Sequence, residues 1–341
     1  MHTVKLGPTG PTAANVALGT WPFAGDKIWG SSERSECIRV VHSALDHGIT
    51  LFDTAPNYGD GRSESILGEA LKGRSEPLVA TKFKADNKSA QEIRHAVQES
   101  LLRLKRDAID ILQLHWPLGT SGATIEALDT FTALQKEGVV RHVGVCNFGV
   151  FDLAETADIE IVSNQIPYSL LWRVAESGVA EATHDHGAAT IAYSPLQQGL
   201  LSGKYDSIES FPTGRKRTRH FPREWRNSRH EESGMERELE SALVDLQELA
   251  RRSSRSLLEL SLAFVASRPF VDIVLVGSRS EEQLLQTVSA CETDLGEDAA
   301  RALQHATDQL KRACGGSLDM YQSDSRVRFS DEKGNPLRRS P

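Results

Sequence analysis

The sequence has few cysteines and no long apolar run, and both absences narrow the class of protein. The four cysteines, Cys37, Cys146, Cys291 and Cys314, show neither CxxC nor any other zinc-type spacing, so we expect reduced thiols and no metal site. No run approaches ~18 apolar residues, the length that a membrane-spanning helix needs. The first residues show no apolar stretch behind basic ones, which predicts a cytoplasmic protein without a membrane partner.

Basic residues are not in excess either. Lys and Arg number 39 against 47 Asp and Glu, a net charge of −8, and this balance disfavours nonspecific binding to nucleic acid. The net negative charge is still compatible with a local basic patch that binds a phosphate. For the basic stretch Arg215-Lys216-Arg217 with Arg219, we favour a cofactor-covering lid or a solvated loop over a nucleic-acid site.

A dinucleotide-binding GxGxxG motif follows none of the strand-like runs, and the first run continues as GTWPFAG. Strand-like runs instead alternate with helical patterns. The runs cover residues 15–20, 49–54, 78–83, 109–114, 140–147, 159–165, 190–195 and 271–277, and the helical patterns include 33–47, 90–104, 124–137 and 175–186. Eight such alternations predict an α/β fold closed into a (β/α)8 TIM barrel. An open doubly wound sheet is the main alternative.

The domain organisation follows from the same pattern. We expect one barrel domain over residues 1–321, with a short N-terminal hairpin or barrel-bottom plug at Val4–Leu6 and its Gly-Pro-Thr-Gly turn. A long, polar and basic loop is predicted at about 196–235, where loops of this length are usually lids or disordered. Residues 322–341 read as a polar C-terminal tail.

Polar side chains stand at or near the ends of successive predicted strands. In a β/α barrel the carboxyl ends of the strands meet at one mouth, where the chemistry takes place. Tyr58, in the loop directly after the second strand, can reach the same place. The strand-end residues are Asp53, Lys82, His115, Asn147, Gln165 and Tyr193.

Four of these residues together suit carbonyl reduction. A free phenol titrates near ~10, and an ammonium nearby favours its ionised form, so we expect Lys82 to make Tyr58 a better proton donor. Asp53 can keep Lys82 protonated, and His115 can hydrogen-bond a substrate oxygen. Each residue alone has a structural explanation, such as a turn aspartate or a core histidine. Jointly, at one barrel mouth, they favour catalysis.

With these residues in place, the chain resembles the aldo-keto reductase superfamily, in its bacterial-type branch with a long loop after the seventh strand. The resemblance runs from about Leu6 to Leu310 as an ordered series of segments. They are ITLFDTAPNYGDGRSESILGEAL, QESLLRLKRDAIDILQLHWP, KEGVVRHVGVCNF, IAYSPLQQGLLSGKY and IVLVGSRSEEQL. Such a series is far more specific than any single motif.

The resemblance implies a (β/α)8 barrel that binds NADP(H), with NAD(H) less favoured, and a catalytic tetrad of Asp53, Tyr58, Lys82 and His115. It further implies that Asn147 and Gln165 hold the nicotinamide carboxamide and that Tyr193 stacks on the ring. Arg279 would pair with the 2′-phosphate of NADP. The full implied cofactor set is Gly19, Thr20, Trp21, Asp53, Cys146, Asn147, Gln165, Tyr193, Ser194, Leu196, Gln198, Gly199, Leu200, Gly277, Ser278, Arg279, Gln283, Gln286 and Thr287.

Two residues depart from the family pattern. Cys146 stands where a serine is usual, and a thiol is a weaker hydrogen-bonding group. Thr287 stands where an asparagine often contacts adenine. Neither departure touches the tetrad.

The substrate side is less defined by the sequence. We expect Trp21, Tyr58, His115 and Trp116 to contact a small-molecule substrate. Trp21, Trp29, Trp116 and Trp172, together with Tyr168, form a candidate aromatic rim, suited to sugars, polyols or aromatic aldehydes; these residues lie in predicted loops.

The sequence therefore predicts an oxidoreductase that moves hydride between NADP(H) and a carbonyl or alcohol, with Tyr58 as general acid and base. Two alternatives stay open. One is a cofactor-binding regulatory subunit of the same family that acts through partners. The other is a barrel enzyme, of epimerase or lyase type, that uses the nicotinamide transiently. The physiological substrate, the direction of reaction and the oligomeric state stay open as well.

Overall fold

Eight parallel strands close into a barrel in the order β10-β3-β4-β5-β6-β7-β8-β9. The structure, a computed structural model, describes residues 1–225 and 228–322. The barrel strands are β3 (Val16–Gly19), β4 (Leu51–Asp53), β5 (Leu78–Phe83), β6 (Ile109–Leu114), β7 (Val140–Cys146), β8 (Ser163–Pro167), β9 (Ala189–Tyr193) and β10 (Ile273–Gly277). The predicted (β/α)8 barrel is confirmed, and the open sheet is excluded because β10 pairs with β3.

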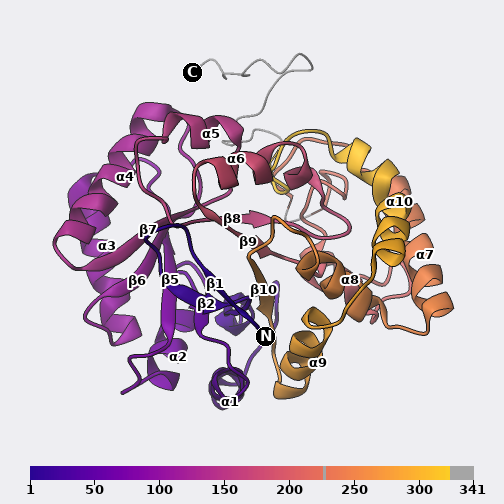
Figure 1. The fold of residues 1–341 in the computed structure, drawn as a ribbon, viewed down its shortest axis with the longest axis horizontal. Coiled ribbons are helices and arrows are strands. Elements are labelled where there is room, and N and C mark those ends of the chain that lie inside the picture. Colours follow the sequence, from indigo (N-terminus) through magenta and orange to yellow (C-terminus); the bar gives the residue numbers. More distant parts are fainter. Residues whose placement is uncertain (226–227, 323–341) are drawn as a thin grey trace.

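Helices cover the outside of the barrel (Figure 1). They are α1 (Arg34–Asp46), α2 (Arg62–Ala70), α3 (Ala90–Leu104), α4 (Ser121–Lys136), α5 (Val150–Glu155), α6 (Val179–Asp185), α7 (Glu236–Ser253), α8 (Leu257–Ala266), α9 (Glu281–Cys291) and α10 (Glu297–Cys314). Short 3-10 turns are η1 (Trp21–Ala24), η2 (Val174–Glu176), η3 (Gln197–Ser202) and η4 (Thr213–Arg215). Helices α7 and α10 pack against each other at one side of the barrel.

Local sequence signals explain why several elements form where they do. Every residue of β6 is buried, as expected for a strand covered on both faces by side chains or helices. Helix α3 starts at a capping box in which Ser89 accepts a hydrogen bond from the backbone N–H of Glu92 and the Glu92 carboxylate accepts from Ser89. The predicted bounds of this helix are confirmed.

An N-terminal hairpin closes the amino end of the barrel. Strands β1 (Thr3–Lys5) and β2 (Thr12–Ala14) pair antiparallel. Between and beside them, Leu6 and Ala13 are buried in the same cluster as residues that begin barrel strands, including Ala189 and Ile273. The prediction of a hairpin that plugs the bottom of the barrel is confirmed.

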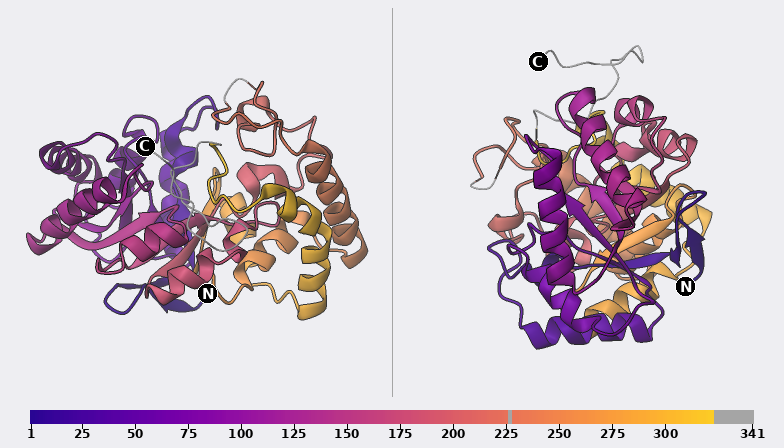
Figure 2. Two further views of the ribbon diagram at one scale, coloured as in Figure 1. Left: turned by 90° about the horizontal axis from the view of Figure 1, so that it is seen from above. Right: turned by 90° about the vertical axis from the view of Figure 1, so that its left-hand side faces the viewer.

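The chain between β9 and α7 forms the long loop over the opposite end of the barrel from this hairpin (Figure 2). Arg219 fixes part of the loop: its Nε donates to Glu232 at 2.7 and 2.8 Å, and its Nη1 donates to the Ser317 and Asp319 carbonyls at 3.3 and 3.2 Å. The loop is thus bound to the segment that follows α10. The predicted polar tail lies, from residue 323 on, outside the described residues.

Several predicted elements differ from the structure by one to three residues at an end, and two differ more. The strand expected at residues 159–165 begins only at Ser163, because the Ile159 N–H donates to the Thr156 carbonyl and closes a turn instead. The helix expected at 175–186 is divided into η2 and α6. Gly178, which lies between them, has a φ of 91°, a left-handed conformation that favours glycine and interrupts a helix.

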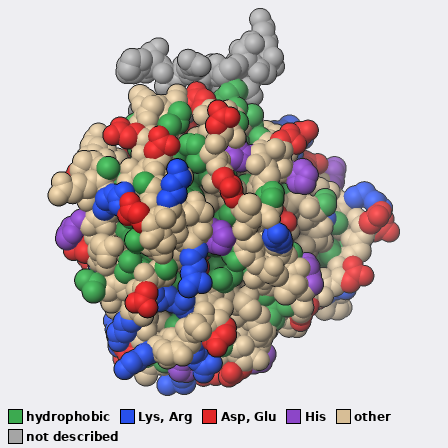
Figure 3. All heavy atoms as spheres, turned by 60° about the vertical axis from the view of Figure 1, so that its left-hand side comes forward, with side chains coloured by type: hydrophobic (Ala, Val, Ile, Leu, Met, Phe, Trp, Pro, Cys, Tyr) green, Lys and Arg blue, Asp and Glu red, His purple; other side chains and the backbone are tan. Residues whose placement is uncertain are grey.

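The molecular surface carries charges of both signs. On the side of the molecule that lies left in Figure 1, basic, acidic and hydrophobic side chains are interspersed (Figure 3). Within residues 1–225 and 228–322, no helix combines the length and the apolar character needed to cross a membrane. The same residues contain no group of three or more His, Cys, Asp or Glu side chains that could hold a metal ion.

Candidate active site

Three barrel elements bring the predicted tetrad together at the carboxyl ends of the strands. Asp53 ends β4, Lys82 lies next to last in β5, and His115 directly follows β6. The Lys82 ammonium forms an ion pair with the Asp53 carboxylate and donates to the Thr54 carbonyl at 2.9 Å. It also donates to the Tyr58 hydroxyl at 3.3 Å. The amine and the phenol that the sequence suggested as partners are therefore in contact.

The ion pair beneath the phenol is almost fully buried. The side chains of Lys82 and Asp53 are 1% and 3% exposed. Burial by itself disfavours the charged amine, but the Asp53 carboxylate, together with smaller contributions from Tyr58 and Cys146, raises the pKa of Lys82 above its ordinary value. Lys82 therefore stays protonated at neutral pH.

The expected effect of Lys82 on Tyr58 is only partly right. Burial raises the pKa of Tyr58 to about 12, and the positive charge of Lys82 offsets only part of that rise. Lys82 thus lowers the pKa of Tyr58, the direction that the sequence predicted, but burial outweighs this effect. The physical reason is that Asp53 neutralises much of the ammonium's field, while the phenol itself is removed from water.

Gln113 is a buried site residue that the sequence analysis did not single out. Its Nε2 donates to Asp53 Oδ2 at 3.0 Å, and Gln165 Nε2 donates to the same oxygen at 2.9 Å. The Cys146 thiol in turn donates to Gln113 Oε1 at 3.6 Å. The signal for Gln113 was present: it is one of two polar residues in β6, and it stands two positions before His115 and so on the same face.

An aromatic wall stands beside the tetrad. The Trp21 ring stacks on the Tyr58 ring at 5.8 Å between centroids, and Trp29 meets Trp21 edge-on at 5.3 Å. The imidazole of His115 lies edge-on to Tyr58 at 6.5 Å. Such an arrangement limits the rotamers of Tyr58 and keeps its hydroxyl directed at the pocket floor.

The proposed nicotinamide side of the site is also connected. The hydroxyl group of Tyr193, the last residue of β9, donates a hydrogen bond to Asn147 Oδ1 at 2.8 Å. Asn147 Nδ2 in turn donates a hydrogen bond to the His115 carbonyl at 3.0 Å. Asn147 and Ser194 have φ values of 62° and 55°, a left-handed conformation that is uncommon outside glycine and often found at functional sites. The mouth thus has a defined and locally strained backbone.

A cavity of about 560 Å3 opens over these residues. Asp53, Tyr58, His115 and Trp116 line it. Of the remaining residues implied as cofactor ligands, the following also line it: Gly19, Trp21, Cys146, Asn147, Gln165, Tyr193, Ser194, Leu196, Gln198, Gly199, Gly277, Arg279, Gln283, Gln286 and Thr287.

Three of the implied cofactor ligands lie outside this lining. Thr20 is fully buried and donates its hydroxyl hydrogen bond to the Asp53 carbonyl at 2.9 Å. Leu200 is packed in the hydrophobic core, and Ser278 is buried. Their side chains therefore support the walls of the cavity rather than face it.

Two members of the predicted aromatic rim are not at the mouth, and their assignment to it was wrong. Trp172 is fully buried in the core and donates its Nε1 hydrogen bond to the Leu318 carbonyl at 3.2 Å. Tyr168 is fully buried and donates its hydroxyl hydrogen bond to Glu176 at 2.6 Å. Tyr168 stacks on Phe264 of α8 and Trp172 hydrogen-bonds to the segment after α10, long-range contacts that local sequence does not indicate.

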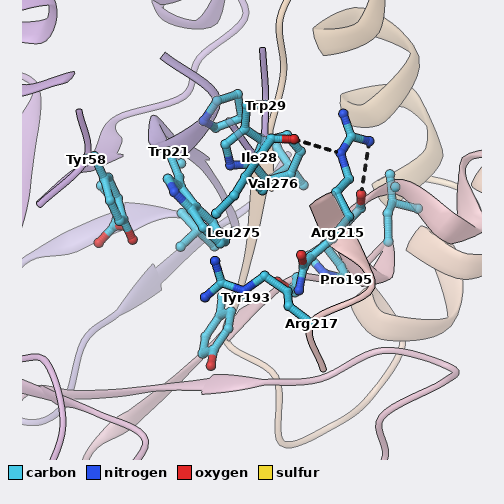
Figure 4. A pocket seen from close by; sticks show the side chains of 18 of the residues that line it. Trp21, Ile28, Trp29, Tyr58, Tyr193, Pro195, Arg215, Arg217, Leu275 and Val276 are labelled. Carbon is cyan, nitrogen blue, oxygen red and sulfur yellow. Dashed lines mark hydrogen bonds between the residues drawn. The ribbon is translucent and has the colours of Figure 1, made fainter. Parts of the chain in front are cut away.

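The basic loop, predicted as a cofactor-covering lid or a solvated loop, contributes Arg215 and Arg217 to the lining of the cavity. Arg215 donates to the Ile28 carbonyl at 3.2 Å and to the Gln198 carbonyl at 3.3 Å, and its guanidinium lies 4.8 Å above the Trp29 ring (Figure 4). It thereby connects the loop after β9 to the loop after β3. Tyr321, from the segment after α10, also lines the cavity and was missed because nothing local distinguishes it from a surface tyrosine.

Arg279 lies at the rim, at the start of α9. Its Nη2 donates to the Ser31 carbonyl at 2.7 Å, and its backbone N–H donates to Gln283 Oε1 at 3.0 Å. The Thr287 hydroxyl donates to the Gln283 carbonyl at 2.7 Å. The residues implied for the adenine end of a dinucleotide are thus grouped in the first half of α9 and in the residues just before it.

A closed (β/α)8 barrel with a buried ion pair, a phenol and an imidazole at its carboxyl end defines the class of protein, and comparison with known proteins gives the family. Residues 15–308 match the model of the aldo/keto reductase family. The chain belongs to this family, whose members are oxidoreductases that use a nicotinamide cofactor and act on small molecules.

Individual relatives agree with this assignment. The chain is 34% identical to the aldo-keto reductase YhdN of Bacillus subtilis, over 83% of this chain and 87% of that protein. It is 30% identical to the NADH-specific methylglyoxal reductase of Escherichia coli, over 92% and 100% of the two chains. The solved structure of the glycerol dehydrogenase AKR11B4 from Gluconobacter oxydans matches with a TM-score of 0.74 and 28% identity, over 90% and 95% of the two chains.

Proposed function

We propose that the protein is an NADP(H)-dependent oxidoreductase that interconverts a carbonyl compound and an alcohol, with Tyr58 as general acid and base. The observation that carries the proposal is the contact at 3.3 Å between the Tyr58 hydroxyl and the buried ammonium of Lys82. An acid for a developing alkoxide must be protonated, positioned and close to a charge that stabilises its ionised form. Tyr58 meets these requirements at the floor of the cavity.

The residues around the cavity fit a nicotinamide dinucleotide. The amide groups of Asn147 and Gln165 suit a carboxamide, and the Tyr193 ring suits a flat heterocycle. Basic side chains at the rim suit phosphates. The Oε1 of Gln198 is buried and has no hydrogen-bond partner among the described residues, so it offers an acceptor for a ligand hydroxyl. When bound, the cofactor would supply or accept the hydride.

The remaining steps rest on the chain's own side chains. Tyr58 gives its proton to the carbonyl oxygen, and the ammonium of Lys82 stabilises the phenolate that results. Asp53 keeps Lys82 charged and is itself held by the amides of Gln113 and Gln165. His115, edge-on to the phenol, orients the substrate oxygen from the other side.

We further propose that NADP(H) is preferred over NAD(H). Arg279 supports this preference because a guanidinium at the rim suits a 2′-phosphate. One relative is named NADH-specific, so the family alone does not decide the question. Replacing Arg279 with Gln should weaken NADPH binding about tenfold, the loss expected for one charge-assisted hydrogen bond, and leave NADH binding unchanged.

Tyr58→Phe tests the proposed chemistry. The variant should lose turnover by about 100-fold or more, the contribution typical of a general acid, while a tryptophan-fluorescence titration with NADPH stays at the wild-type affinity. Unchanged turnover in Tyr58→Phe would overturn the assignment. A wild-type protein that binds NADPH but reduces no member of an aldehyde and sugar panel would point to a regulatory subunit, and product formation without net NADPH oxidation would point to an epimerase or lyase.

A further inference from the structure

The basic loop carries three alternate arginines, and they differ in how the protein satisfies them. The guanidinium of Arg215 donates to two backbone carbonyls and stacks on Trp29. Arg219 pairs with Glu232 and donates to carbonyls of the segment after α10. The guanidinium groups of both residues thus have hydrogen-bond partners within the protein, as is usual for residues that stabilise a fold.

Arg217, between them, is held in a different way. Its guanidinium lies 5.6 Å above the Trp21 ring and 4.9 Å above the Tyr321 ring. Its Nε is buried and has no hydrogen-bond partner within residues 1–225 and 228–322, and no carboxylate in the same part of the chain forms a salt bridge with it. Two aromatic faces thus fix the plane of a cation whose hydrogen-bonding edge is left for a ligand.

This cation points into the cavity on the side of the proposed acid. In Figure 4 the Arg217 side chain extends from the loop toward Tyr193 and the side on which Trp21 and Tyr58 stand. Trp21 stacks on Tyr58 and also contacts the Arg217 guanidinium, so the guanidinium and the phenol share one indole as a neighbour. Both Tyr58 and Arg217 line the cavity, so one ligand can contact both.

The cavity as a whole is basic although the chain is acidic. Among its described lining residues, only Asp26 and Asp53 are carboxylates. Asp53 is paired with Lys82, and Asp26 accepts the backbone N–H groups of Ile28 and Trp29. The basic lining residues are Lys84, Lys204, Arg215, Arg217, Arg229 and Arg279. A cavity of this charge favours anionic ligands.

We propose that Arg217 binds an anionic group, a carboxylate or a phosphate, carried by the carbonyl substrate. The proposal rests on the proposed function, because it names the substrate class of the same site. The phosphates of the cofactor are the other source of this chemistry. Arg279, just before α9, and Arg215 with Lys204, in the loop after β9, are further cations of the same cavity that can serve those phosphates. Arg217 differs from them in its contact with Trp21, a residue implied for both cofactor and substrate, whose ring stacks on Tyr58.

A matched pair of substrates tests the proposal. The probes are 4-carboxybenzaldehyde and 4-formylbenzamide, which are close in shape and differ in charge. For the wild-type protein we expect kcat/KM to favour the carboxylate. In Arg217→Met, which keeps an apolar stem between the two rings, this preference should fall by about 10- to 100-fold, the range for a charge-assisted hydrogen bond. Arg217→Lys should keep part of it, because the charge remains but the planar fork is lost.

The controls separate the possible sources of the anion. Arg223→Gln removes an exposed arginine of the same loop, whose partners are Glu224 and Glu231, and should leave the preference unchanged. An unchanged preference in Arg217→Met overturns the proposal. So does a tenfold weaker NADPH affinity with an unchanged preference, since Arg217 would then serve the cofactor diphosphate.

A second readout does not depend on turnover. Quenching of tryptophan fluorescence by each probe measures binding to the NADP-loaded protein, where the wild type should bind the carboxylate at least tenfold more tightly than Arg217→Met does. Equal binding by the two proteins contradicts the anion site. A protein that binds the carboxylate in this way but reduces neither probe would contradict the proposed reduction while supporting Arg217 as an anion-binding residue.

Discussion

Lys82 is the buried cation on which the proposed site depends, and Lys82→Met is the substitution that tests it most directly. The change removes the ammonium but keeps a side chain of similar length, so the carboxylate of Asp53, which is 3% exposed, remains without its counterion. Removing one partner of a buried ion pair costs about 3–5 kcal/mol. The two amide donors on Asp53 remain, so we expect a loss near the lower end, about 3 kcal/mol.

Urea unfolding followed by tryptophan fluorescence at neutral pH measures this loss as a lower midpoint at an unchanged slope. The double variant Lys82→Met/Asp53→Asn is the matched control. It no longer carries a stranded charge, so it should be more stable than Lys82→Met by about 1 kcal/mol or more, while both variants lack carbonyl reduction. A Lys82→Met protein within about 0.5 kcal/mol of the wild type, or a double variant less stable than the single one, would refute this account of the ion pair.

The remaining predictions concern residues around the site. Gln113→Leu removes a donor to the Asp53 carboxylate and should lower the free energy of unfolding by about 2 kcal/mol in urea titrations; no change would mean that Gln165 alone suffices. Burial lowers the pKa of His220 to about 4, so this group contributes stability above its unfolded pKa of about 6.5 that is lost as the pH falls toward 4. Unfolding midpoints measured between pH 7 and 4.5 should therefore fall in the wild type and fall less in His220→Gln, and parallel curves would contradict this. Arg279→Gln, titrated with both cofactors, should lose affinity for NADPH alone.

Much of the fold could be predicted from the sequence because its signals are local. The strand at Ile109–Leu114 and the helix at Ala90–Leu104 have the predicted bounds, since the first is a short run rich in Ile and Leu and the second has both an apolar stripe and a capping box. The strand at Ser163–Pro167 was displaced in the prediction because Ile159 and Ile161 are apolar without being in the sheet. Hydrophobicity predicts which residues are buried, but it does not predict which of them form the backbone hydrogen bonds of a strand.

Which side chains meet at the mouth was predictable in part for a geometric reason. The surroundings of a polar residue at the carboxyl end of a barrel strand are largely determined by the fold, because all these strand ends lie at one mouth. That reasoning predicts that Asp53, Lys82 and His115 lie at the mouth. It does not predict the positions of Arg217 and Tyr321. These residues lie in a long loop and in the segment after α10, where the sequence has no periodic pattern from which a position could be predicted.

The position of Tyr58 was easier to predict than its acidity, and the difference bears on the direction of the proposed reaction. Acidity depends on how much water is removed from the phenol compared with how much field Lys82 supplies, and here removal of water prevails, with a pKa of about 12. Such a phenol keeps its proton throughout the neutral range. An alkoxide is a much stronger base than a phenolate, so in the proposed reaction proton transfer from Tyr58 to an oxygen with developing alkoxide character would remain downhill. Alcohol oxidation would first require the phenolate, which is scarce at pH 7. For the proposed reaction, the raised pKa of Tyr58 therefore matches the role of an acid in carbonyl reduction at neutral pH.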